Sequence, residues 1–155
     1  MSFLECIRRE YNHVRKDCAE PGEGHRVNRK GLPRHVIVNG DAMDPANASS
    51  DCICFFESED SVTVAVVELM GNLKDISHRV KKLRNAAAIA EKIVKACNTH
   101  GHRVAFFPII YHHGIGNPQL RKLRKHANGV FFRGYNHLVI QREYKIPLAR
   151  VLTST

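Results

Sequence analysis

The apolar residues of this chain recur with the spacing of two amphipathic helices. In residues 3–16 they fall on one side of a helix, and Ser2 is placed to cap its N-terminus. A longer helix is predicted from Asp75, its N-terminal cap, to about residue 99, before Gly101 ends it. The apolar positions of this second helix share one face: Ile76, Val80, Leu83, Ala87, Ala90, Val94 and Cys97. Each helix therefore has one face to bury against another element.

Strand-forming residues dominate four other segments. Residues 35–39 predict a short strand, and residues 51–70 a hairpin with an acidic turn. Residues 103–111 predict a buried strand, in which Pro108 favours an edge position or a bulge. Residues 130–140 read as a second hairpin around Gly134. The predicted order is α-β-β-β-α-β, followed by a basic segment and a hairpin, within a single domain.

The 51–70 hairpin carries two carboxylates at informative places. Asp51 opens its first strand, and Glu68 lies near the end of the second, where only Thr63 and Glu68 are polar between Val62 and Leu69. Such strands are usually buried on both faces. A carboxylate in one of them must be paired, protonated or bound to a cation, because a bare buried charge is too costly. We therefore expect a divalent-metal site at one end of a small sheet, although Asp51 could simply begin its strand from a turn.

Charge is segregated along the chain. Residues 35–70 contain seven acidic residues and no lysine or arginine, whereas residues 71–155 contain 16 basic and three acidic residues. An acidic segment flanked by basic segments suits a protein that binds a polyanion. The basic residues would contact its phosphates, and metal ions at the carboxylates would offset the repulsion between the two. The basic residues near the start of the long helix are equally well explained as a solvated face. The candidate phosphate-binding residues are Arg26, Arg29, Lys30, Lys81, Lys82, Arg121, Lys122, Arg124 and Lys125.

The cysteines and the N-terminus bear on the cellular compartment. The five cysteines are odd in number, contain no Cys-x-x-Cys pair and lie mostly in apolar runs, so we interpret them as core residues rather than disulfides. Charge appears too early in the sequence for a signal peptide, and no apolar run approaches membrane length. A cytoplasmic, or at least intracellular, protein without membrane contact is expected.

The element order and these residues together resemble the PD-(D/E)XK nuclease superfamily, the restriction-endonuclease-like fold. Its core is αβββαβ with a mixed central sheet; it would cover about residues 3–110, leaving 111–155 as a basic extension. Ser50-Asp51 stands where Pro-Asp is usual, and Glu68-Leu69-Met70 stands where Glu-x-Lys is expected. The resemblance implies that Asp51, Glu68 and the Leu69 backbone carbonyl bind Mg²⁺ or Mn²⁺. Glu10 could add a carboxylate, but we prefer to place it on the helix surface.

Met70 departs from the family pattern, in which the lysine positions the attacking water and neutralises developing charge. A thioether can do neither. The explanation we place first is a deliberate Lys→Met change that inactivates the site. A migrated lysine (Lys74, Lys81 or Lys82) and a natural pseudo-nuclease are alternatives, and Met70 could also be a core residue with the motif a coincidence.

A pair of histidines follows the predicted strand 103–111. His112, His113 and the later His126 invite comparison with ββα-metal nucleases, but their spacing differs from that family's. We expect His112 and His113 to border a substrate groove rather than to bind metal.

Two functions are compatible with this sequence. The first is a metal-dependent nuclease of repair, recombination or defence, acting on DNA more than RNA. The second is a non-cleaving nucleic-acid-binding or assembly subunit on the same fold. Small relatives of this kind often act as homodimers or within a larger complex.

Overall fold

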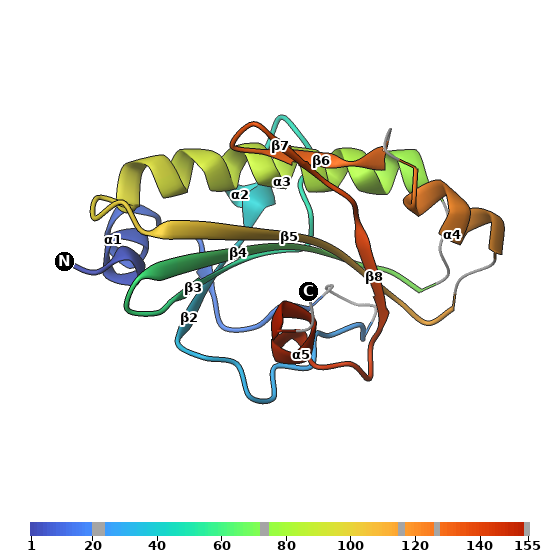
Figure 1. Cartoon of the computed structure of the whole chain (residues 1–155), viewed down its shortest axis with the longest axis horizontal. Helices are drawn as coiled ribbons and strands as arrows, with labels where there is room; N and C mark the ends of the chain where they lie inside the picture. Colours follow the sequence, from blue (N-terminus) through green and yellow to red (C-terminus); the bar gives the residue numbers. More distant parts are fainter. Residues whose placement is uncertain (20–23, 72–74, 115–116, 126–127, 154–155) are drawn as a thin grey trace.

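Six strands form one mixed sheet, and two more form a separate hairpin (Figure 1). The computed structural model describes residues 1–19, 24–71, 75–114, 117–125 and 128–153. The elements in chain order are α1 (Phe3–Glu10), β1 (Val14–Arg15), β2 (His35–Val38), α2 (Gly40–Met43), β3 (Cys52–Glu57), β4 (Ser61–Leu69), α3 (Ile76–Cys97), β5 (Arg103–His112), α4 (Asn117–Leu123), β6 (Val130–Phe132), β7 (Tyr135–His137), β8 (Ile140–Glu143) and α5 (Leu148–Thr153). The large sheet has the order β1-β2-β3-β4-β5-β8, and β6 pairs with β7. The chain is thus an α/β protein.

The hairpin expected over residues 51–70 is confirmed as β3 and β4. These strands pair antiparallel, with Cys52 opposite Val67 and Glu57 opposite Val62. The turn is closed by the Ser58 N–H, which donates to the Ser61 carbonyl at 3.0 Å. β2 continues the antiparallel order on the other side of β3.

The long helix α3 connects two parallel strands. A parallel pair needs a crossover connection, and α3 supplies it between β4 and β5. β5 lies inside the sheet, because β8 pairs in parallel with its second half. Pro108 pairs with Val66 of β4 and lies just before Ile109, where β8 begins to pair with β5, so the edge position expected for Pro108 is confirmed locally.

The sheet separates two apolar layers. Helix α3 runs along one face together with α1 and the β6–β7 hairpin, and α5 lies on the opposite face (Figure 1). Successive side chains of β4 point to opposite layers. Val64 and Val66 pack on the α3 side, and Ala65 and Val67 on the α5 side. Even-numbered β4 residues therefore face α3, which decides where Glu68 points.

Two predicted elements end earlier than expected. Helix α1 stops at Glu10, although Ser2 caps it as expected and also forms a capping box with Glu5. The chain then becomes extended, because β1 pairs with the edge of β2. In the C-terminal hairpin, Arg133 and Gly134 supply the turn with positive φ angles of 51° and 84°. Its second strand ends at His137, and the chain from Ile140 pairs with β5 of the main sheet instead.

The cysteine interpretation is corrected by two disulfides. Cys6 of α1 is bonded to Cys97 at the end of α3, and Cys18 is bonded to Cys52 at the start of β3. Each pair has a Cα–Cα distance of 5.6 Å, because the fold brings together apolar positions that are far apart in sequence. Disulfides are rare in cytosolic proteins, so these two favour an oxidising compartment over the expected cytoplasm. Among the described helices, none is both long enough and apolar enough to cross a bilayer.

Candidate active site at the end of strand β4

Glu68 is the most unusual ionisable residue of the sheet. Its side chain is fully buried and lies on the face of β4 that α3 covers. Arg79 and Lys82, three residues apart on α3, point to the same carboxylate. Lys82 Nζ lies 3.0 Å and Arg79 Nη1 3.5 Å from Glu68 Oε2. The carboxylate is thus held between a strand and the first turns of a helix.

Asp51 lies next to Glu68 because of the hairpin register. Cys52 pairs with Val67, so one further step of the same register sets Asp51 opposite Glu68. The Asp51 carboxylate accepts a hydrogen bond from the Leu69 N–H at 2.7 Å. Arg15 donates to the Asp51 carbonyl at 2.8 Å and fixes the backbone there. The two acidic residues identified from sequence are therefore brought together at one end of the sheet.

The two carboxyl groups interact directly. Burial, a hydrogen bond with Asp51 and repulsion by the Asp51 charge together raise the pKa of Glu68 to about 9, against the opposing effect of Lys82. The pKa of Glu68 is thus raised even though Lys82 and Arg79 lie beside the same carboxyl group. Such a raised carboxyl pKa is typical of functional sites.

The Mg²⁺ or Mn²⁺ expected at this pair of carboxylates stays a prediction, because among the described residues the group of three ligands that could hold a metal consists of Cys18, Cys52 and Cys54. Within the part of the chain that the structure describes, Glu68 Oε2 is buried without a hydrogen bond but is ion-paired with Lys82 and Arg79. A cation between Asp51 and Glu68 would have to share that oxygen with these two side chains, and carboxylate oxygens suit Mg²⁺ or Mn²⁺. The Leu69 backbone adjoins Asp51 through its N–H, and its carbonyl as a further ligand stays a prediction. Glu10 is surface-exposed and pairs with Arg9 at 3.8 Å.

Met70 is part of the apolar core below α3. Its side chain is only 2% exposed and belongs to the same buried cluster as Ile76 and Val80. Its N–H donates to the Tyr111 carbonyl at 3.1 Å, and its carbonyl accepts from the Tyr144 hydroxyl at 2.7 Å. Met70 itself brings no polar group to the carboxylates.

Lys82 is the lysine that meets Glu68. Of the three lysines considered from sequence, Lys82 alone has a described contact with Glu68, at 3.2 Å from Oε1 and 3.0 Å from Oε2. Lys81 is exposed to solvent, and Lys74 lies outside the described residues. The explanations given for Met70 stay predictions.

Of the nine candidate phosphate-binding residues, Lys81 and Lys82 lie on α3, and the other seven divide into two groups. The first is the α4 basic group, defined as Arg121, Lys122, Arg124 and Lys125, and all four are exposed. Lys122 lines a cleft of about 840 Å³ together with Asp75 and His78 at the start of α3. The second group lies beyond the other face of the sheet, where Arg26 and Arg29 pair with Asp17 at 2.9 and 3.1 Å. Lys30 of that loop is also exposed.

Aromatic and histidine side chains form a cluster that the sequence did not predict. His25, His113 and Tyr144 lie with ring centroids 4.7 to 5.2 Å apart. They gather beside the ends of β4 and β5, and only the strand register could have revealed this. The expectation that His112 borders a groove is wrong, because it is 2% exposed and bonds Gln141 at 2.7 Å. His126 lies outside the described residues.

Comparisons of the chain with protein-family models, with curated proteins and with solved structures found no match. The assignment of a function therefore rests on the geometry of this chain.

Proposed function

We propose that this protein is a metal-dependent nuclease of the PD-(D/E)XK kind, in which Lys82 replaces the lysine absent at position 70. The observation that carries the proposal is the buried cluster of Asp51, Glu68 and Lys82, with Lys82 Nζ 3.0 Å from the Glu68 carboxylate. With the two-residue β1 and the four-residue α2 left aside, the element order α1-β2-β3-β4-α3-β5 gives further support, since the same order describes the core of that superfamily.

Each side chain has a distinct part in this proposal. Asp51 and Glu68 would bind Mg²⁺ or Mn²⁺, and the Leu69 N–H orients the Asp51 carboxylate. The bound metal would lower the pKa of a water and offset charge on a phosphodiester. Lys82, which has 17% of its side chain exposed, can hold a water beside Glu68 and stabilise a developing negative charge. Arg79 adds a second cation at the same carboxylate.

The substrate would be a nucleic acid, with DNA favoured by the resemblance. The α4 basic group and the cleft at the start of α3 lie on the part of the molecule that carries Arg79 and Lys82. Exposed arginines and lysines bind phosphates without reading sequence. A homodimer or a larger repair or defence complex would be consistent with so small a chain.

The test is an assay for cleavage of double-stranded DNA, single-stranded DNA and RNA in the presence of Mg²⁺ or Mn²⁺. The negative control contains EDTA, which removes the metal. We expect cleavage by the unmodified chain, and its loss in Asp51→Asn and Glu68→Gln. Lys82→Met should lower the rate by at least about a hundredfold, as removal of a single charge-stabilising donor does. Lys92→Met is the matched control, because Lys92 is an exposed lysine of the same helix without a part in the proposal, and its rate should stay unchanged. Equal rates for the Lys82 and Lys92 variants would refute the role given to Lys82.

A non-cleaving nucleic-acid-binding or assembly subunit is the second candidate. The observation that favours it is the charge balance at Glu68, whose carboxylate already has two cationic neighbours without any metal. Such a protein would bind DNA or RNA with a steep salt dependence and leave the strands intact in every metal tested.

A further inference from the structure

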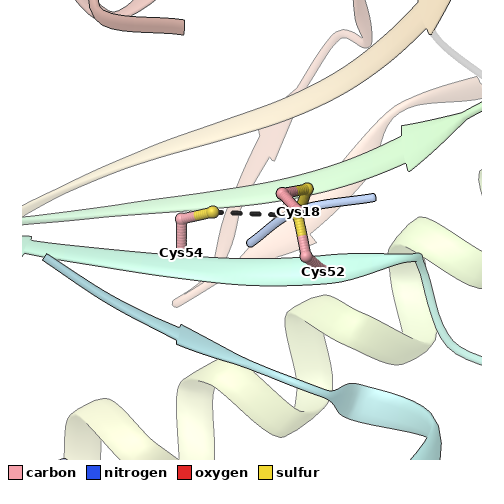
Figure 2. A group of neighbouring side chains, drawn as sticks. All are labelled: Cys18, Cys52 and Cys54. Carbon is pink, nitrogen blue, oxygen red and sulfur yellow. Dashed lines mark hydrogen bonds between the residues drawn. A yellow bond between two sulfur atoms is a disulfide. The ribbon is translucent and has the colours of Figure 1, made fainter. Parts of the chain in front are cut away.

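Three cysteines meet on the face of the sheet opposite α3. Cys52 and Cys54 alternate along β3 and so point to the same side, and Cys18 reaches them from the segment after β1 (Figure 2). All three are at most 1% exposed. Their sulfur atoms lie within 4.8 Å of one another, and the Cys52 and Cys54 sulfurs are 3.8 Å apart.

The spacing of the Cys52 and Cys54 sulfurs matches a three-coordinate metal, and the sulfurs of Cys18 and Cys52, which are bonded to one another in the structure, would have to separate to the same spacing on reduction. With metal–sulfur bonds of about 2.3 Å, three sulfurs around a planar centre lie about 4 Å apart. The described residues contribute no fourth Cys, His, Asp or Glu ligand atom to this cluster. Zn²⁺ in structural sites takes four ligands, whereas thiolates select soft ions such as Cu(I). The cluster therefore suits a soft ion that accepts three ligands and no water.

Two arginines provide the charge that such a site needs. One Cu(I) with three thiolates carries two negative charges. Arg15 donates to the carbonyls of Asp51 and Ala19, the residues beside Cys52 and Cys18, at 2.8 and 2.9 Å. Arg29 lies 3.1 Å from Asp17, whose carboxylate also accepts the Cys18 N–H at 2.8 Å. The two guanidinium groups thus lie beside the cluster, next to the residues that adjoin Cys18 and Cys52.

We propose that the reduced protein binds one Cu(I) ion through the thiolates of Cys18, Cys52 and Cys54. In the structure Cys18 and Cys52 form a disulfide, so metal binding and the disulfide exclude one another. A thiol reductant first converts the disulfide to two thiols and is itself oxidised to a disulfide. Cu(I) then displaces three protons, one from each thiol, with no change in oxidation state.

Cys54 lies buried beside the disulfide, with its sulfur 3.8 Å from that of Cys52. Cys54 is the cysteine that the structure leaves without a disulfide, so it is available as the third ligand.

The experiment uses the full chain, reduced with excess thiol and titrated with Cu(I) under anaerobic conditions against a coloured Cu(I) chelator. We expect the chain to withdraw one equivalent of Cu(I), and X-ray absorption to find three sulfur neighbours at about 2.3 Å. The oxidised protein should withdraw none. Zn²⁺ added at the same concentration should not displace the bound Cu(I).

Variants separate this site from the other cysteines. Cys54→Ser and Cys18→Ser should each weaken Cu(I) retention by at least about tenfold. The double variant Cys6→Ser/Cys97→Ser, which removes the other cysteine pair, should retain Cu(I) like the parent. The proposal is overturned if the reduced parent withdraws no Cu(I), if fewer than three sulfurs surround the metal, or if Zn²⁺ binds as tightly. The sulfur count needs no variant, so a misfolded Cys54→Ser protein would not leave the question open.

Discussion

Glu68 combines two properties that rarely coexist in one side chain. It has no exposed surface, and it faces one carboxyl group and two cationic groups at once. Sequence reasoning found Glu68 because a carboxylate interrupts an apolar strand. It could not single out Lys82, because lysines 74, 81 and 82 are equivalent until the helix is placed on the sheet. Which lysine meets the carboxylate depends on tertiary packing.

The raised pKa of Glu68 predicts how the metal-free protein responds to pH. The folded-state pKa of about 9 lies above the ordinary value of 4.5, so folding favours the protonated form. This contribution to stability is complete below about pH 4.5 and is lost as the pH rises toward 9. Between these values the free energy of unfolding should fall by up to about 1.4 kcal/mol per pH unit. Urea unfolding in EDTA at several pH values measures the slope.

Two comparisons isolate the contribution of Glu68 to that slope. Glu68→Gln cannot ionise, so its unfolding free energy should vary less with pH than that of the parent. Adding Mn²⁺ at pH 8 should stabilise the parent and leave Glu68→Gln unchanged. A parent slope that matches that of Glu68→Gln would contradict the prediction.

Moving the lysine back to the strand provides a second prediction. Residues 68 and 70 both face α3, so a lysine at position 70 can reach the side of Glu68 that Lys82 now occupies. We expect Lys82→Met to abolish cleavage and the double variant Lys82→Met/Met70→Lys to regain part of it. Single-turnover cleavage rates in Mg²⁺ measure the rescue.

The single variant Met70→Lys is the control for this exchange. It should cleave no faster than the parent, because Lys82 is still present, and it should be less stable because Met70 is buried. If Met70→Lys cleaves and the parent does not, the lysine was lost from position 70 rather than moved to α3.

Local patterns account for most individual elements of this fold. The β3–β4 hairpin and α3 follow from apolar periodicity, although Asp75, the expected cap of α3, makes no side-chain capping hydrogen bond. The failures concern partners that are distant in sequence. Helix α1 ends early because the residues after it pair, as β1, with the open edge of β2. The predicted C-terminal hairpin ends early because its last residues pair instead, as β8, with the open edge of β5. Neither edge can be recognised from the residues that pair with it.

Helix α4 is the element whose contribution to binding is most directly testable. Replacing all four residues of the α4 basic group by alanine should weaken DNA binding uniformly across sequences. Each lost phosphate contact should also reduce the slope of log K against log[salt] by about 0.7–0.9. Fluorescence anisotropy at several salt concentrations measures both effects.

A control with equal charge loss distinguishes a local contact from net charge. The alanine control replaces four exposed basic residues outside α4: Lys92, Lys95, Arg103 and Lys145. It should bind more tightly than the α4 variant at every salt concentration. Equal loss in both variants would mean that the net charge of +9, rather than α4, attracts the polyanion.

At the scale of the whole molecule, the Cys6–Cys97 bond joins the first helix to the end of the longest one across a sequence separation of 91. A cross-link of this span restricts the unfolded chain strongly, and its loss costs about 2–5 kcal/mol. We expect Cys6→Ser/Cys97→Ser to lower the free energy of unfolding by that amount under oxidising conditions. Under reducing conditions the variant and the parent should differ much less. Urea unfolding with and without reductant makes the comparison, and equal stability in both conditions would contradict the prediction.

The Cys18–Cys52 bond also closes a covalent ring around an exposed basic loop. Arg26, Arg29 and Lys30 lie inside this ring and are accessible to trypsin. A cut beside any of them opens the ring without separating its ends, so the nicked protein keeps its mass, apart from one added water, until it is reduced. Gel electrophoresis would show one band without reductant and two fragments with it. A protease could thus sever the backbone between β1 and β2 while the sheet stays covalently joined across the break.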